Sequence, residues 1–397
     1  MSSKPVLVAA LSGRALGASA RRAGFVPFVV DAFGDKDTRA RADVYRGLPA
    51  ATHEGFRART LIPILKALAA AAGEPPVGLV LGSGFEDTPK LVATLARRFM
   101  LLGSDAPAIA RAKDPATFFP LLDTLSIPHP ETSTAPPSNP EGWLSKRIGG
   151  SGGAHVLRCS AVGPRAGRYY QRRIAGEPVS LLAVAQSGHL AIVGFSRQWT
   201  VGTEPRPYRY AGAVGPAELE AATMERMAAA AERVSAELRL VGLVSFDFLV
   251  TERAPFLLEV NPRPGATLDV FDDAAGSLFA AHVAACRGEP FTLPPPPSGA
   301  RAAGILYADR GALTPALSPW PDWTADRPMP GTRIPHHRPV ATAFAAGESA
   351  QAAEHNCRRR LDELALMLYG RAPDTEQNNA KTYRPRRERV GAGSQAR

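Results

Sequence analysis

Cysteine is scarce in this sequence, and the three that occur, Cys159, Cys286 and Cys357, lie far apart. Cysteine-based metal sites need ligands at short spacing, and secreted disulfide frameworks need several matched pairs. The sequence therefore excludes a cysteine-based zinc site. It favours the reducing cytoplasm, where thiols remain free.

Long apolar runs are also missing. A membrane-spanning helix needs roughly 18 consecutive apolar residues, and no stretch of this sequence approaches that length. Lys4 followed by VLVAAL imitates a signal peptide, but the run is short and Arg14 interrupts the segment after it. We expect a first strand there, and a protein without a membrane partner.

The charge balance is basic, at a formal +10. Seven basic and three acidic residues fall within 371–397, a polar segment that we expect to be a disordered basic tail. The remaining excess is spread thinly, so a nucleic-acid partner is not favoured. It suits a polyanionic small molecule such as ATP equally well.

The first hundred residues predict an α/β domain. Two apolar runs, Val6–Leu11 and Phe25–Val30, flank a helical stretch at Ala15–Ala23, which is a strand–helix–strand unit. The G-x-G-x-x-G dinucleotide motif is absent. Polar residues follow the strands at Ser12, Arg14, Ser83 and Glu86, either as the lining of a substrate crevice or as ordinary turns and helix caps.

A glycine-rich segment follows a lysine in the middle of the chain. Lys146 and Arg147 precede GGSGG at 149–153. Glycines let backbone N–H groups approach phosphate oxygens closely, and a lysine adds a point charge. The Walker motif G-x-x-x-x-G-K-[ST] is absent. The segment predicts either a phosphate-covering flap or a flexible linker, and its position between two apolar stretches favours the flap.

The stretch from Gly242 to Asp269 predicts two strands joined by a turn. Apolar residues alternate with others on both sides of a polar turn at 251–255, the pattern of a strand with two different faces. We expect Val250 to pair with Phe256 across the turn. Phe256, Leu258 and Val260 should then share one face of the second strand.

Three oxygen-bearing side chains should meet on the opposite face. Glu259 and Asn261 share a side of the pleat because they are two residues apart, and Asp247 should lie opposite Glu259. Like charges directly opposite each other repel, so a cation would stabilise the patch. Carboxylate and amide oxygens suit Mg²⁺, which proteins usually hold with one or two carboxylates plus substrate phosphates. The alternative is a solvated hairpin with a polar outer face.

FDFLV followed by LLEVNPRPG, after a long helical segment, resembles the metal-binding end of the ATP-grasp superfamily. The resemblance implies that Asp247, Glu259 and Asn261 bind one or two Mg²⁺, for which Mn²⁺ could substitute. It also implies that Arg263 stabilises charge on the transferred phosphoryl group, so Arg263 and Lys146 are the expected catalytic residues.

The upstream parts of that family occur in the same order. A lysine stands before a helix, a glycine flap follows a second lysine, and a linker then binds adenine through its backbone and ribose through a carboxylate. A basic hairpin turn is the alternative for the linker at 168–180. The resemblance implies ATP binding by Lys113, Lys146, Gly149, Gly150, Ser151, Gly152, Gly153, Gln171, Arg172, Ile174 and Glu177.

The implied fold combines α/β and α+β parts. We expect a Rossmann-like pre-ATP-grasp domain at 1–105 and a two-lobed ATP-grasp domain at 106–290. A proline-rich boundary at 290–297 then leads into a small C-terminal lobe at 291–370, followed by the basic tail at 371–397.

The implied activity is that of an ADP-forming carboxylate–amine ligase. A small-molecule carboxylate would be activated as an acyl phosphate and joined to an amine. A narrower resemblance, to carboligase-like proteins and the tyramine–glutamate ligases of methanofuran-type cofactor synthesis, suggests glutamate addition in C1-carrier biosynthesis. A biotin- or bicarbonate-dependent carboxylase and a non-catalytic nucleotide-binding regulator are the alternatives.

Overall fold

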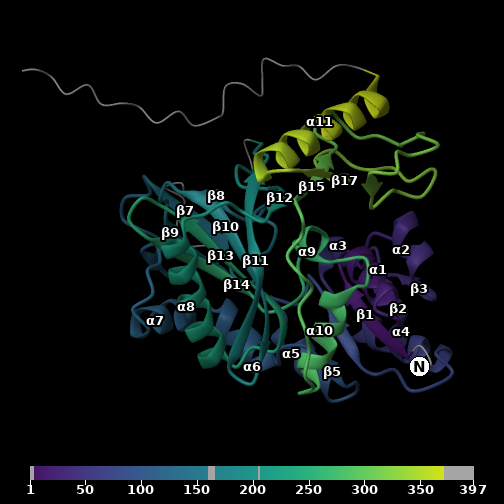
Figure 1. The fold of residues 1–397 in the computed structure, drawn as a ribbon, viewed down its shortest axis with the longest axis horizontal. Helices are drawn as coiled ribbons and strands as arrows, with labels where there is room; N and C mark the ends of the chain where they lie inside the picture. The colour runs from purple at the N-terminus through teal and green to yellow at the C-terminus, as the bar shows by residue number, and fades with distance from the viewer. Residues whose placement is uncertain (1–3, 160–165, 204–205, 371–397) are drawn as a thin grey trace, which may run out of the picture.

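The computed structural model describes residues 4–159, 166–203 and 206–370, and its strands form three sheets (Figure 1). The predicted tail at 371–397 lies outside the described residues. Within the described ranges, none of the helices combines the length and the apolar character that crossing a membrane requires.

The N-terminal lobe is a five-stranded sheet with helices packed around it, in the order β3-β2-β1-β4-β5 with parallel pairing throughout. This is a doubly wound arrangement, as predicted, and its carboxyl edge is where such folds bind ligands. Its strands are β1 (Pro5–Ala10), β2 (Val26–Asp31), β3 (Val44–Gly47), β4 (Leu79–Leu81) and β5 (Leu101–Leu102). Its helices are α1 (Arg14–Arg22), α2 (Lys36–Arg41), α3 (Ala51–Glu54), α4 (Ala58–Ala71) and α5 (Pro89–Ala96).

A small antiparallel sheet follows, in the order β6-β9-β7-β8. Two helices lead into it, and the residue between them, Asp114, caps the second helix by accepting from the Ala116 N–H. The elements are α6 (Ala106–Lys113), α7 (Pro115–Thr124), β6 (Thr132–Ser133), β7 (Trp143–Arg147), β8 (Leu157–Arg158) and β9 (Arg168–Arg172).

The largest sheet has eight strands in the order β14-β13-β10-β11-β12-β15-β17-β16. It runs without a break across the predicted boundary at 290/291, because β12 pairs with β15. The strands are β10 (Glu177–Gln186), β11 (His189–Thr200), β12 (Tyr210–Gly215), β13 (Gly242–Val250), β14 (Pro255–Asn261), β15 (Ala300–Tyr307), β16 (Thr324–Ala325) and β17 (Pro339–Gly347). The associated helices are α8 (Ala221–Leu238), α9 (Leu268–Phe271), α10 (Ser277–Cys286) and α11 (Ala350–Tyr369).

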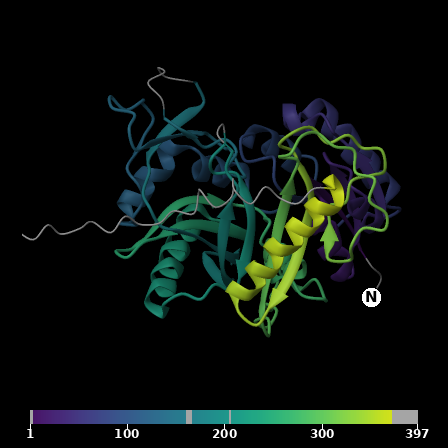
Figure 2. The ribbon, with the colours of Figure 1, turned by 90° about the horizontal axis from the view of Figure 1, so that it is seen from above.

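Hydrophobic cores lie on both faces of the large sheet. On one face α7 and α8 pack on β10, β13 and β14, and Met227, Ala231, Val234 and Leu238 form the buried stripe of α8. On the other face α10 and the N-terminal lobe pack on β10, β13, β12 and β15. Figure 2 shows α11 lying across β15 and β17 in the C-terminal lobe.

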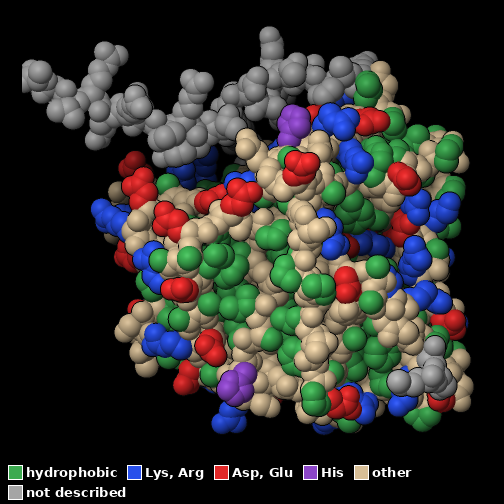
Figure 3. Space-filling view, in the orientation of Figure 1, with side chains coloured by type: hydrophobic (Ala, Val, Ile, Leu, Met, Phe, Trp, Pro, Cys, Tyr) green, Lys and Arg blue, Asp and Glu red, His purple; other side chains and the backbone are tan. Residues whose placement is uncertain are grey.

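Arg14 ties the N-terminal lobe to the rest of the chain. Its guanidinium bonds both carboxylate oxygens of Asp269, one at 2.6 Å, and both of Asp326 at 3.0 Å. Arg14 is therefore fully paired, which makes it an interlobe clamp rather than a free crevice residue. On the face shown in Figure 3, basic and acidic side chains are interspersed.

Candidate active site

The carboxylates of β13 and β14 meet through a β-bulge. Val250 pairs with Pro255 and Phe248 with Leu257, but Asp247 pairs with Glu259, so Leu258 is an extra residue in β14. The predicted pairing of Val250 with Phe256 is therefore wrong, although Asp247 does lie opposite Glu259.

The bulge also changes which residues of β14 face the core. Leu257 and Val260 are both fully buried in the core beside Phe246 and Phe248, while Leu258 is only partly buried. The predicted grouping of Phe256, Leu258 and Val260 on one face is therefore wrong. Because the extra residue reverses the alternation once, Leu257 and Val260 can share the core, and Glu259 and Asn261 turn together toward the opposite face.

Asp247, Glu259 and Asn261 form one hydrogen-bonded group. The Asn261 amide nitrogen donates to Asp247 at 2.9 Å and to Glu259 at 3.3 Å. Its amide oxygen accepts from the Lys113 ammonium at 2.8 Å. Lys113 also lies 3.8 Å from Glu259, and only 6% of its side chain is exposed. The structure thus brings the three predicted metal ligands and Lys113 into one cluster.

The pKa values of Asp247 and Glu259 are shifted in opposite directions. Burial, together with the charge of Glu259, raises the pKa of Asp247. Burial opposes ionisation of Glu259 too, but Lys113 and the other cations outweigh it, so the pKa of Glu259 is lowered. Like charges held this close disfavour double ionisation, and added positive charge relieves the conflict.

Lys146 faces this cluster from β7. Its ammonium donates to the side-chain oxygen of Gln171 at 2.5 Å. Burial lowers its pKa, while the nearby carboxylates of Glu259 and Asp247 oppose that effect. Two lysines, one at the end of α6 and one on β7, therefore lie beside the paired carboxylates, which is a suitable arrangement for a chain of phosphates.

The glycine segment at 149–153 is docked rather than extended into solvent. The Gly152 carbonyl accepts from the Tyr210 N–H at 3.0 Å, at the start of β12. A Cβ added at Gly153 would lie 1.8 Å from the Tyr208 carbonyl oxygen, and one added at Gly149 would lie 2.6 Å from Asp87 Cα. Glycine is required at these contacts because the segment touches both the large sheet and the N-terminal lobe.

The residues predicted to bind adenine contact other protein groups in this structure. The buried Gln171 amide is occupied by Lys146 and by Thr132, at 2.5 and 3.1 Å. The Arg172 N–H donates to the Glu131 carbonyl, and Ile174 is partly buried in the following segment. These assignments remain predictions.

Glu177 does not join the carboxylate–lysine cluster. As the first residue of β10 it shares a face with Val179 and Leu181, opposite to the face of Ser180. Its side chain is 45% exposed and lies 3.4 Å from Arg197. Contact with a ribose therefore remains a prediction.

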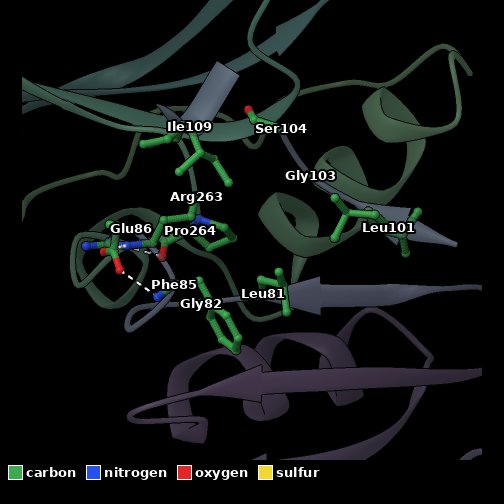
Figure 4. Close-up of a pocket in the computed structure, with 12 residues that line it drawn as sticks. Leu81, Gly82, Phe85, Glu86, Leu101, Gly103, Ser104, Ile109, Arg263 and Pro264 are labelled. Carbon is green, nitrogen blue, oxygen red and sulfur yellow. Dashed lines mark hydrogen bonds and ion pairs between the residues drawn. The ribbon is translucent and has the colours of Figure 1, made fainter. Parts of the chain in front are cut away.

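Arg263 is held by Glu86 from the N-terminal lobe. Its Nε donates to Glu86 at 2.6 Å and its Nη1 to the Pro264 carbonyl at 3.2 Å. Glu86 also accepts from the Gly84 and Phe85 N–H groups, and only 3% of its side chain is exposed. Arg263 and Lys113 outweigh the effect of burial and lower the pKa of Glu86. Figure 4 shows this pair beside a small, mostly apolar pocket at the ends of β4 and β5.

Three further residues of the site are not among the predicted ATP, metal or catalytic residues. Ser180 and Gln198 donate to the same oxygen of Asp247, at 2.7 and 3.2 Å. His155, two residues after the glycine segment, lines a cavity with Lys113, Arg147 and Glu259. Ser180 could be found only with the strand order in hand, whereas the position of His155 beside the glycines was a visible signal.

The donor set fits a magnesium ion with one rearrangement. Two carboxylates on neighbouring strands supply hard oxygen ligands, and a bound cation would favour ionisation of Asp247, whose pKa burial and the neighbouring Glu259 raise. The Asn261 oxygen points to Lys113, so ligation by Asn261 requires its amide to rotate. Among the described residues no group of three or more His, Cys, Asp or Glu side chains has metal-site geometry, so this set of two carboxylates and an amide relies on phosphate or water for further ligands.

Comparison with known families identifies the central region. Residues 112–267 match the family model of the ATP-grasp domain. That range contains the carboxylate pair, both lysines and the glycine segment. It places the predicted family resemblance on a domain that spans the site described above.

Two curated relatives match about half of this chain. The carbamoyl phosphate synthase large chains of Myxococcus xanthus and Deinococcus radiodurans are 25% identical over 239 and 238 residues. These matches cover 54% and 53% of this chain but 22% and 23% of those proteins, so the chain spans about a quarter of their length.

Solved structures match nearly the whole fold. A biotin carboxylase from Campylobacter jejuni superposes with a TM-score of 0.67 at 17% identity, over 95% of this chain and 97% of that one. The N5-carboxyaminoimidazole ribonucleotide synthetase purK, in complex with ADP, gives 0.64 at 13% identity, over 92% and 98%. Likeness at this identity establishes a shared fold.

Proposed function

Because this chain belongs to the ATP-grasp superfamily, we propose that it is an ATP- and Mg²⁺-dependent ligase that activates a carboxylate and transfers the acyl group to an amine. The observation that carries the proposal is the cluster of Asp247, Glu259 and Asn261 with Lys113 and Lys146 around it. In the proposed complex, Mg²⁺ would supply the positive charge that the two carboxylates lack.

The chemistry needs no protein nucleophile. A carboxylate oxygen of the first substrate attacks the γ-phosphorus of ATP, and ADP leaves. The amine nitrogen then attacks the acyl carbon, inorganic phosphate leaves, and the nitrogen loses a proton. Lys113 and Lys146 would neutralise phosphate charge, and Arg263, held by Glu86, would stabilise charge on the transferred group.

Docking of the glycine segment supports the same proposal. The segment follows β7 and contacts β12 and the loop at Asp87, and Gly149 and Gly150 line the same cavity as Lys113 and Glu259. A cover that excludes water protects an acyl phosphate from hydrolysis. Glutamate addition in C1-carrier biosynthesis remains a narrower hypothesis about the same site.

Formation of ADP tests the proposal. The protein with Mg·ATP is incubated with pools of carboxylic acids and amines, ADP is measured, and products are identified by mass spectrometry. ADP release that needs both a carboxylate and an amine supports the ligase. Bicarbonate-dependent phosphate release without an amine would instead indicate a carboxylase, an alternative that the likeness to biotin carboxylase folds makes worth testing.

Three variants test the site itself. Asp247→Asn, Glu259→Gln and Lys146→Ala should each lower turnover at least about tenfold, or roughly 1.4 kcal/mol in the barrier. Glu252→Gln, in the exposed turn of the same hairpin, is the matched control and should leave turnover unchanged. Normal turnover in all three variants would contradict the assignment of the site.

A further inference from the structure

His155 lies where the glycine segment returns to the small sheet. Its side chain is partly buried and borders the cavity that Lys113, Arg147 and Glu259 also line. Nothing in the family match or the proposed chemistry gives this histidine a role.

The imidazole is packed against the segment that it follows. A Cβ added at Gly150 would lie 2.4 Å from two ring carbons of His155 and 2.7 Å from its Nδ1. Nδ1 lies 3.3 Å from the Ser151 carbonyl oxygen. The ring therefore lies under the turn of the glycine segment and contacts two of its residues.

The backbone of His155 is braced to the strand that carries Lys146. The Arg168 guanidinium donates to the His155 carbonyl at 2.8 Å and to the Ser145 carbonyl at 2.6 Å, and its Nε donates to the Ser145 hydroxyl at 2.7 Å. Ser145 precedes Lys146, so Arg168 fixes the backbone at His155 relative to the strand that carries Lys146.

The ring is a donor at Nδ1. Burial lowers the pKa of His155 to about 4, so the imidazole is neutral at physiological pH and carries one N–H. A carbonyl oxygen can only accept, so the proton sits on Nδ1, toward Ser151. The N–H groups of Gly149 and Ser151 have no hydrogen-bond partner among the described residues, and they are available to phosphate oxygens.

We propose that His155 is a positioning residue that holds residues 149–151 in the docked conformation, so that the free backbone N–H groups are ready for the nucleotide phosphates. The phosphate part of this inference rests on the proposed function; the bracing of the segment does not. Preorganised donors bind charge without a further ordering penalty.

Two substitutions separate the hydrogen bond from the packing. His155→Asn places an amide donor near the position of Nδ1 but lacks the ring. His155→Phe keeps a ring against Gly150 but has no donor. His189→Asn and His189→Phe, at an exposed position at the start of β11, are the matched controls.

Amide hydrogen exchange of residues 149–153 in the nucleotide-free protein is the first measurement. We expect His155→Phe to speed exchange of this segment at least about tenfold, with His155→Asn within about threefold of the original protein and an unchanged unfolding temperature in both. Unchanged exchange in the Phe variant, or equal acceleration in the Asn variant, would overturn the proposal.

Calorimetric binding of Mg·ADP is the second measurement. The Phe variant should bind at least about tenfold more weakly, and the Asn variant like the original protein. If exchange follows the expected pattern but the original protein binds no Mg·ADP, the proposed function fails and the bracing role stands. Weaker binding that only accompanies a lower unfolding temperature would make His155 a merely structural residue.

Discussion

Replacing Gly153 with alanine should prevent the glycine segment from docking. The added Cβ would lie 1.8 Å from the Tyr208 carbonyl oxygen, whereas real Cβ atoms essentially never come within 3.0 Å of such an atom. The segment would have to move by at least 1.2 Å (3.0 − 1.8 Å). That movement would break the hydrogen bond from the Tyr210 N–H to the Gly152 carbonyl.

Three effects set the magnitude. Gly153 has a φ of +69°, and a left-handed conformation costs alanine about 1 kcal/mol relative to glycine. The lost hydrogen bond adds about 1 kcal/mol, and relief of the clash adds about 1 kcal/mol more. If the docked form binds ATP, KM for ATP should rise by roughly two orders of magnitude, at about 1.4 kcal/mol per tenfold.

Gly152→Ala is the control for the backbone effect. Gly152 has nearly the same φ, +68°, but a Cβ added there meets nothing within 4 Å. This variant should lose only about 1 kcal/mol, or roughly fivefold in KM. Steady-state kinetics with ATP as the varied substrate measures both. Equal effects of the two substitutions would refute the contact with Tyr208 as the reason for glycine at position 153.

Two other predictions concern the charges of the site. Burial and the charge of Glu259 raise the pKa of Asp247 to about 6. Because a cation needs the ionised carboxylate, the Kd for Mg·ADP, measured by calorimetry, should increase as the pH is lowered from neutrality through this value. A Kd that does not depend on pH would contradict the prediction. Glu86→Gln should leave the guanidinium of Arg263 without its charged partner, although the Arg263 side chain is only 15% exposed. The free energy of unfolding, measured by urea denaturation, should therefore fall by about 3 kcal/mol. A loss below about 1 kcal/mol would show that the pair acts as a surface ion pair.

The strands of the site could be predicted from alternation, but their register could not. The pattern around Asp247 and Glu259 correctly predicted two paired strands with facing carboxylates. The extra residue at Leu258 was missed because a bulge leaves no periodic signal. It is selected by packing, since Leu257 and Val260 both enter the core that α7 and α8 cover.

The contacts that orient Asp247 depend on strand order. Ser180 lies on β10 and Gln198 on β11, 67 and 49 residues before Asp247. They reach the same carboxylate oxygen because β10 lies between β13 and β11 in the sheet. A local pattern contains no information about such neighbours, whereas Lys113, predicted from family resemblance, does reach Asn261 and Glu259.

The continuity of the large sheet has a practical consequence for preparing smaller versions of the protein. β12 is paired on one side with β11 and on the other with β15. Ending the chain at residue 290 would remove β15, the strand that pairs with one side of β12, and would leave the backbone N–H and C=O groups on that side of β12 without hydrogen-bond partners. An exposed edge strand pairs with strands of other molecules, so we expect the shortened protein to aggregate. The C-terminal lobe therefore has to be retained in any soluble fragment.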